Sequence, residues 1–302
     1  MKLATVTMNN RTLIAALVDD GKLIDLEAAG QEKGTTAPVP KTMIEAIKQG
    51  DRFLAEAKEI VNWTLEQKKA EFVYAIDDKN VKVQAPIPRP AKNIMCAGKN
   101  YAEHAKEMGS EADIPTDPII FTKSPTTVIA NHDEINPHRD VTESLDYEGE
   151  IAVIIGKQGK NIKAEHANDH IYGYTLLNDV TARDVQKRHK QFFLGKSFDT
   201  FSPMGPAIVP KEELDGQHLS LRTYVNNDLR QETTTENMIF SIPQLIEIIS
   251  RGMTLEPGDI IATGTPAGVG AGFNPPKFLQ PGDKVVIEVD GIGQLQNTVA
   301  PD

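Results

Sequence analysis

The sequence predicts an α+β fold that is rich in β-strands, and two observations carry this prediction. Short apolar runs of strand length outnumber the helical segments, without the regular strand–helix alternation of a doubly wound sheet. The segments LEPGDIIATGT and LQPGDKVVIEVDGIGQL also share a Pro-Gly-Asp turn that leads into an apolar strand. With 302 residues the chain is long enough to bury a large core, in one large domain or two modest ones.

The chain begins with a predicted β-meander. Residues 2–26 read KLATVTMNNRTLIAALVDDGKLIDL, in which strand-like runs are separated by polar turn residues. The turns are predicted at Asn9-Asn10 and at Asp19-Asp20-Gly21, because these residue types favour tight hairpin connections.

Helices and a stiff connector complete the first part of the chain. Residues 41–71 have helical periodicity that Gly50-Asp51 interrupts, which predicts two helices. Prolines at positions 86, 88 and 90 then make an extended segment. We therefore expect a small N-terminal α+β domain over residues 1–90 and a larger domain over residues 91–302.

The second part is predicted to consist mainly of strands. They correspond to the runs NIMCAG, IIFTKS, EIAVIIG, YGYTLLND, SLRTYVNN and LRQETT, with a hairpin turn at Asn226-Asn227-Asp228. A helix is predicted over residues 101–109, where YAEHAKEMG stops at a glycine. Another is predicted for SIPQLIEIISRG, which Ser241 can cap and Gly252 can end.

Composition excludes several classes of protein. A net charge of −11 makes nucleic acid and anionic membranes poor partners. A single cysteine, Cys96, excludes an internal disulfide and any cysteine-rich zinc module. The N-terminal residues contain no long apolar stretch, so we expect neither a signal peptide nor a membrane span, and we place the protein in the cytoplasm.

Two glutamates flank a glycine at the start of the most apolar strand. Because side chains alternate along a strand, Glu148 and Glu150 should point to the same side and repel each other unless a cation lies between them. The alternative is that they are solvated charges guarding a strand end. Asp179, where the next long strand ends, is a candidate third ligand, or else a turn or helix-capping residue. Three carboxylates would suit Mg²⁺ or Mn²⁺ better than zinc.

Other polar residues admit both a functional and a structural interpretation. His104 and Glu107 lie three apart on a predicted helix, either as a general base with its orienting carboxylate or as a surface ion pair. Lys123 and Lys196 could hold an ammonium group near a substrate, or could simply be solvated or snorkelling lysines. The glycine-rich residues 263–272 could present backbone N–H groups to a small carboxylate, or form a flexible hairpin.

Taken together, these segments resemble the fumarylacetoacetate hydrolase family. The resemblance runs from about Ile94 to Ile292 and is carried by GKNYAEH, FTKSP, DYEGEIAVIIG, NDVTARDVQ, GKSFDT, MIFSIPQLI, LEPGDIIATGTPAGVG and PGDKVVIEVDGIG. It implies a mixed β-sandwich or β-roll catalytic domain and a homodimer. The N-terminal segment resembles the variable extra domain of longer bacterial members.

The resemblance also implies roles for individual residues. The metal ligands would be Glu148, Glu150 and Asp179, binding Mg²⁺ or Mn²⁺. The implied catalytic residues are His104 and Glu107, on a helix that acts as a lid, together with Lys196. The implied substrate-binding residues are Lys123, Arg183, Gln186 and Thr265. Two departures concern the substrate: an additional aspartate ligand of fumarylacetoacetases is absent ahead of the lid, and Lys99 stands where acylpyruvate-cleaving relatives usually have arginine.

The implied activity is hydrolysis of the C–C bond of acylpyruvates, which are 2,4-dioxo acids, to pyruvate and a carboxylic acid. Oxaloacetate decarboxylation to pyruvate and CO₂ is the main alternative, because it requires the same enolate stabilisation. An isomerase or decarboxylase of aromatic-catabolism intermediates is a further alternative within the family. From a different class, the chain could be a catalytically idle partner-binding protein, which the retained acids, lysine and His–Glu pair argue against. In each enzymatic case the expected substrate is a small 2-oxo acid.

Overall fold

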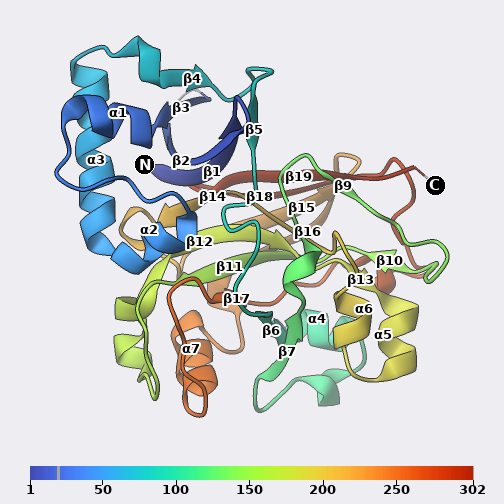
Figure 1. Ribbon diagram of the computed structural model, residues 1–302. Helices are drawn as coiled ribbons and strands as arrows, with labels where there is room; N and C mark the ends of the chain where they lie inside the picture. The colour runs from blue at the N-terminus through green and yellow to red at the C-terminus, as the bar shows by residue number, and fades with distance from the viewer. Residues whose placement is uncertain (19–20, 302) are drawn as a thin grey trace.

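The computed structural model describes residues 1–18 and 21–301, and one twelve-stranded sheet runs through most of the molecule (Figure 1). In spatial order its main strands are β4 (Val73–Ala75), β3 (Lys22–Asp25), β2 (Arg11–Val18), β1 (Lys2–Met8), β14 (Ser202–Pro210), β12 (Ile171–Asn178), β11 (Gly149–Ile155), β17 (Ile260–Ala262), β6 (Ile94–Gly98) and β7 (Ile119–Lys123). At its sides, β5 (Val81–Val83) pairs with β1 and β8 (Val128–Ile129) pairs with β14.

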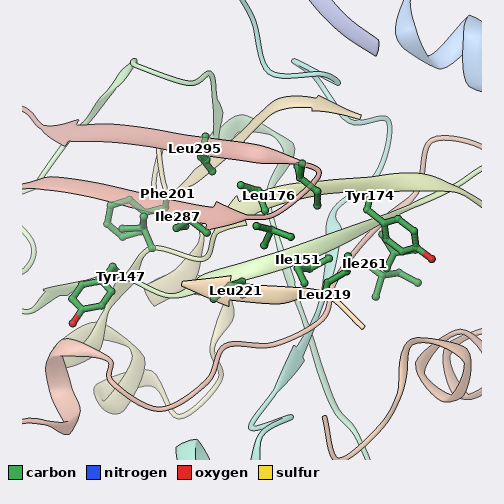
Figure 2. Packing of buried hydrophobic residues seen from close by; sticks show 14 of the residues in the cluster. Tyr147, Ile151, Tyr174, Leu176, Phe201, Leu219, Leu221, Ile261, Ile287 and Leu295 are labelled. Carbon is green, nitrogen blue, oxygen red and sulfur yellow. The ribbon is translucent and has the colours of Figure 1, made fainter. Parts of the chain in front are cut away.

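A second sheet packs against this one. Its five strands are, in order, β16 (Asp228–Thr234), β15 (Ser220–Val225), β18 (Lys284–Val289), β19 (Gly293–Val299) and β9 (Glu134–Ile135). Figure 2 shows Ile151 and Leu176 of the large sheet beside Leu221, Ile287 and Leu295 of the small one, all in one buried cluster. Face-to-face burial of two apolar sheet surfaces is the packing of a β-sandwich, so the predicted β-rich α+β class is confirmed.

The predicted N-terminal meander is confirmed, and it extends the large sheet. β1, β2 and β3 pair antiparallel in sequence order, with Asn9 and Asn10 both at positive φ in the first turn. The predicted turn at Asp19-Asp20 lies outside the described residues. β1 also pairs with β14, Leu3 facing Ile208, although the sequence analysis identified no strand there. The domain boundary near residue 90 stays a prediction, since the sheet is continuous across it.

The helices cover the N-terminal strands and surround one end of the large sheet. They are α1 (Leu26–Lys33), α2 (Met43–Gln49), α3 (Asp51–Glu66), α4 (Ala102–Glu107), α5 (Arg183–His189), α6 (Phe193–Lys196) and α7 (Ile242–Ser250). α2 and α3 are the predicted pair, separated at Gly50 by a positive φ of 57° that suits glycine. α4 and α7 were also predicted, and Ser241 caps α7 in a capping box with Gln244. Among the described residues, no helix is long and apolar enough to cross a membrane.

Candidate metal centre and active site

Three carboxylates converge at one end of the β11–β12 pair. Gly149 of β11 pairs with Asn178 of β12, so Glu148 and Glu150 lie next to Asp179, which directly follows β12. The Glu148 amide donates to Asn178 Oδ1 at 3.0 Å, and the Asp179 amide donates to the Glu148 carbonyl at 2.8 Å. One oxygen from each carboxylate lies within 4.8 Å of the other two, and all three side chains are buried. The structure therefore brings together the acids predicted as metal ligands.

Three cationic side chains neutralise two of these acids. Lys196 Nζ lies 2.7 Å from Glu148 Oε2 and 2.7 Å from Asp179 Oδ2. Lys123 Nζ contacts Asp179 Oδ1 at 2.6 Å, and Arg183 Nη1 contacts Glu148 Oε1 at 2.8 Å. Burial alone would raise the pKa of Glu148, but the charges of Lys196 and Arg183 lower it to about 2. Glu148 is therefore ionised at neutral pH.

Glu150 has no cationic partner among the described residues. Only 1% of its surface is exposed, and its Oε2 accepts a hydrogen bond from the Gly264 amide at 2.8 Å. Burial, followed by the negative charges of Asp179 and Glu148, raises the pKa of Glu150 well above its ordinary value. A cation shared by the three carboxylates would offset this repulsion, and three carboxylates suit a divalent ion such as Mg²⁺ or Mn²⁺. The residues present thus fit a divalent metal.

A cavity of about 530 Å³ reaches the carboxylate cluster at Glu148, the one of the three acids that lines it. Six of the predicted site residues line it: His104, Glu148, Arg183, Gln186, Lys196 and Thr265. Phe121 and Phe192 line it as well, packed edge to face with ring centres 5.3 Å apart, and the Lys196 ammonium lies 5.1 Å from the Phe121 ring centre. Lys123 does not line the cavity; it is fully buried behind Asp179. Lys123 therefore contacts the predicted metal ligand Asp179, and its role in substrate binding stays a prediction.

The predicted His–Glu pair is formed on α4. His104 Nδ1 lies 3.3 Å from Glu107 Oε2, and His104 is only 5% exposed. The Glu107 carboxylate also accepts hydrogen bonds from the Gly268 amide at 3.0 and 3.1 Å. A β-carbon at Gly272 would collide with Glu107, so glycine is needed for this close approach. When Nδ1–H donates to Glu107, Nε2 of His104 is left as a proton acceptor at the cavity.

The glycine-rich segment 263–272 matches neither interpretation drawn from the sequence, a loop that binds a substrate carboxylate or a flexible hairpin. Its backbone amides donate to carboxylates of the protein itself: Gly264 to Glu150, Gly268 to Glu107, and Gly270 and Ala271 to Asp146. These four amides are therefore occupied and do not form a cradle for a substrate carboxylate. They tie α4 and the carboxylate cluster to one loop.

Two residues that organise the site were not predicted from the sequence. Asp146 is fully buried and accepts from Arg183 Nε at 2.8 Å, which orients the guanidinium toward Glu148. It lies two residues before Glu148, so the same alternation that pointed to the glutamates could have found it. Gln231 accepts from the Gly149 amide at 3.0 Å and donates to Thr265 Oγ1 at 2.7 Å. No signal in the sequence distinguishes it from any other strand glutamine.

Thr265 and Gln186 both line the cavity, but they differ in whether their side chains have a hydrogen-bond donor left for a bound molecule. Thr265 Oγ1 donates to the Gly149 carbonyl at 3.0 Å and accepts from Gln231, so its hydroxyl holds the start of β11 in place. Gln186 Oε1 accepts from Arg183 Nη1 at 3.4 Å, and its amide nitrogen has no partner among the described residues. Gln186 therefore has a donor available to a bound molecule, whereas Thr265 has already committed its hydrogen to the backbone.

Comparison with known proteins identifies the family. Residues 93–300 match the family model described as the C-terminal domain of fumarylacetoacetate (FAA) hydrolase. The oxaloacetate tautomerase YisK of Bacillus subtilis is 52% identical over 302 residues, covering 99% of this chain and 100% of that protein.

Solved structures agree in fold over the whole chain. A fumarylacetoacetate hydrolase from the psychrophilic Exiguobacterium antarcticum superposes with a TM-score of 0.81 at 37% identity, covering 100% of both chains. A maleylpyruvate hydrolase from Sphingobium sp. SYK-6, in complex with manganese(II) and pyruvate, superposes with a TM-score of 0.75 at 27% identity, covering 99% of each chain. The chain, with its buried carboxylates and His–Glu pair, therefore belongs to the fumarylacetoacetate hydrolase family.

Proposed function

We propose that this protein is a divalent-metal-dependent enzyme that interconverts the keto and enol forms of oxaloacetate. The observation that carries the proposal is one cavity that joins the carboxylate cluster to His104. Proton transfer at C3 of a 2-oxo acid requires a base together with positive charge near the developing enolate oxygen. The 52% identity to an oxaloacetate tautomerase over the whole chain supports this reaction. It replaces C–C hydrolysis as the reaction we favour.

Glu148, Glu150 and Asp179 would hold the metal, which supplies positive charge to the enolate oxygen of a bound 2-oxo acid. The Lys196 ammonium contacts both Glu148 and Asp179 at 2.7 Å, and its charge lowers the pKa of Glu148. Arg183, held by Asp146, contributes a second fixed positive charge next to Glu148. The carboxylate cluster is thus set before substrate arrives, so little reorganisation is needed during the reaction.

His104 would take the C3 proton of the keto form, and the C2 oxygen would gain a proton to give the enol. In the reverse direction the C2 hydroxyl would lose its proton and His104 would return a proton to C3. Glu107 fixes the ring orientation through Nδ1, so that Nε2 faces the proton to be moved. Closure of α4 over the cavity would exclude the water molecule that C–C hydrolysis needs. Proton transfer back to the substrate would then be favoured over hydrolysis of the substrate.

Acylpyruvate hydrolysis is the second candidate, and the same His104–Glu107 pair favours it. His104 would then deprotonate a water molecule that attacks the C4 carbonyl, while Lys196 and Gln186 stabilise the oxyanion formed there. The similar maleylpyruvate hydrolase, bound to manganese(II) and pyruvate, supports this candidate, although at 27% its identity is lower than that of the tautomerase. Oxaloacetate decarboxylation, which also yields pyruvate, has weaker support from the same comparison. A homodimer remains our prediction for either reaction.

The first experiment compares three assays on one preparation with Mg²⁺, with Mn²⁺ and with a chelator. Enol absorbance reports oxaloacetate tautomerisation, and pyruvate release reports both oxaloacetate decarboxylation and acetylpyruvate cleavage. We expect chelator-sensitive tautomerisation to be the fastest reaction. Faster pyruvate release from acetylpyruvate would make hydrolysis the principal activity. Activity that is insensitive to the chelator would refute the metal-dependent proposal.

Substitutions on α4 test the base. His104→Asn should lower kcat by about 10²–10⁴-fold, the usual contribution of a positioned general base. Glu107→Gln should cost less, roughly tenfold, because it loosens the orientation of His104 without removing it. Glu103→Gln is the matched control, since Glu103 is exposed on the same helix and, among the described residues, pairs only with Lys106. Equal rates for His104→Asn and Glu103→Gln would exclude His104 as the base.

A further inference from the structure

Three lysines surround the outer part of the active-site cavity, and we call them the rim lysines. Lys99 follows β6, Lys187 lies in the last turn of α5, and Lys190 is the residue at which α5 ends. They reach the cavity from two segments far apart in the sequence, and α4 and α5 lie close together in Figure 1. Such a cluster is unexpected in a chain with a net charge of −11.

The inner cations are already neutralised by acids of the protein. Lys196 contacts Glu148 and Asp179, and Arg183 contacts Asp146 and Glu148. Arg183 Nη2 is left without a hydrogen-bond partner among the described residues, but two carboxylates already balance the charge of Arg183, so a second negative charge on a substrate would find no unbalanced cation at the inner end of the cavity.

The rim lysines differ in this respect. The side chains of Lys187 and Lys190 are exposed and have no ion pair or hydrogen bond among the described residues, and Lys190 directly follows the last residue of α5. Among the described residues, the Lys99 ammonium pairs with the exposed Asp113, at 3.1 Å. Lys187 and Lys190 are thus positive charges at one cavity without a paired acid among the described residues, an arrangement that favours binding of an anion.

Backbone conformation adds a second argument. Lys99 has φ of 52° and Lys190 has φ of 61°, a left-handed conformation that glycine or asparagine adopts with less strain. Cations near the end of α5 are also favoured by the helix dipole, which accounts for Arg188 and His189 equally well. The dipole does not account for Lys99, which lies outside the helix, or for two lysines in a strained backbone conformation at the same cavity.

We propose that the rim lysines bind a second carboxylate of the substrate, so that the enzyme selects dicarboxylic 2-oxo acids over monocarboxylic ones. This inference depends on the proposed function, in which the 2-oxo acid end of the substrate occupies the inner part of the cavity. It identifies Lys187 and Lys190 as specificity-determining residues that take no part in the proton transfer.

The test compares oxaloacetate with its 4-methyl ester, which has the same 2-oxo acid end and one negative charge fewer. In the double variant Lys187→Gln/Lys190→Gln, the ratio of kcat/KM for oxaloacetate to that for the ester should fall at least about tenfold, mainly through KM, and added salt should reduce the wild-type ratio. Arg188→Gln is the matched control, because it removes one charge from the same turn of α5 without lining the cavity.

The outcomes separate this inference from the proposed function. An equal loss for both substrates, or an equal fall in the ratio for Arg188→Gln, would overturn the role of the rim. If the wild type turns over neither substrate, the proposed function fails. Calorimetric titration of the metal-loaded protein with each compound then tests binding by the rim lysines independently of turnover. A wild-type binding preference for oxaloacetate that the double variant loses would support the rim, and no preference would overturn it.

Discussion

Replacing Glu150 with glutamine is expected to lower kcat by about a thousandfold, because a neutral amide replaces one of the three carboxylates that would hold the cation. Glutamine has nearly the same shape, and its oxygen can still accept the 2.8 Å hydrogen bond from Gly264. The fold should therefore persist. Turnover of oxaloacetate at saturating Mg²⁺ or Mn²⁺, together with calorimetric metal affinity, measures the effect. Turnover close to that of the wild type would remove Glu150 from the metal site.

The same variant should stabilise the metal-free protein at neutral pH. Because the pKa of Glu150 is raised in the folded state above its ordinary value of about 4.3, the folded protein keeps a proton that the unfolded chain has released. The free energy of unfolding of the wild type therefore falls as the pH rises from about 4 through the raised pKa. That of Glu150→Gln does not fall for this reason, because glutamine does not ionise. The melting temperature of the variant should exceed that of the wild type by a margin that widens with pH. Parallel melting curves would contradict the assigned cause.

Glu148 would be a less informative position for this test. Its pKa is lowered to about 2, so it contributes stability that is complete above about pH 4.3 and lost as the pH falls toward 2. Removing it would leave Lys196 and Arg183 each without one carboxylate partner in a buried site. A loss of activity there could come from unfolding as easily as from the loss of a ligand.

Local patterns in the sequence were sufficient to place the predicted site residues beside one another, although their roles came from the family resemblance. The alternation of side chains along β11 places Glu148 and Glu150 on one side, and the end of a strand places Asp179 beside a turn. The spacing of three between His104 and Glu107 predicts a shared helix face, which α4 confirms. These predictions succeed because each depends on a period or an offset within one element.

What the sequence could not predict depends on pairing between distant segments. Leu3 faces Ile208 across the β1–β14 pair, so the N-terminal strands continue the large sheet, and no local pattern encodes that partner. Gln231 reaches Gly149 and Thr265 only because β16 lies beside the β11 end in the folded chain. The position of Lys196 between two acids likewise depends on where α6 packs, which its own sequence does not specify.

The contacts of Lys196 lead to the second large effect. Lys196→Met keeps most of the stem volume but removes the ammonium that both Glu148 and Asp179 contact at 2.7 Å. Loss of one partner from a buried ion cluster typically costs about 3–5 kcal/mol. The metal-free variant should therefore melt roughly 5–10 °C below the wild type, as the usual relation between stability and melting temperature implies. Because burial then acts on Glu148 with less opposing charge, its pKa should rise from about 2.

A divalent cation should reverse much of this loss, because it restores positive charge to the same carboxylates. We therefore expect the metal-induced rise in melting temperature to be larger in Lys196→Met than in the wild type, while kcat stays at least about a hundredfold lower. Lys92→Met is the matched control, since Lys92 pairs with Glu256 and Asp259 near the surface, where ion pairs add little stability. If the metal-induced rise were no larger in Lys196→Met, Lys196 and the cation would not serve the same carboxylates, and Lys196 would have to act on the substrate alone.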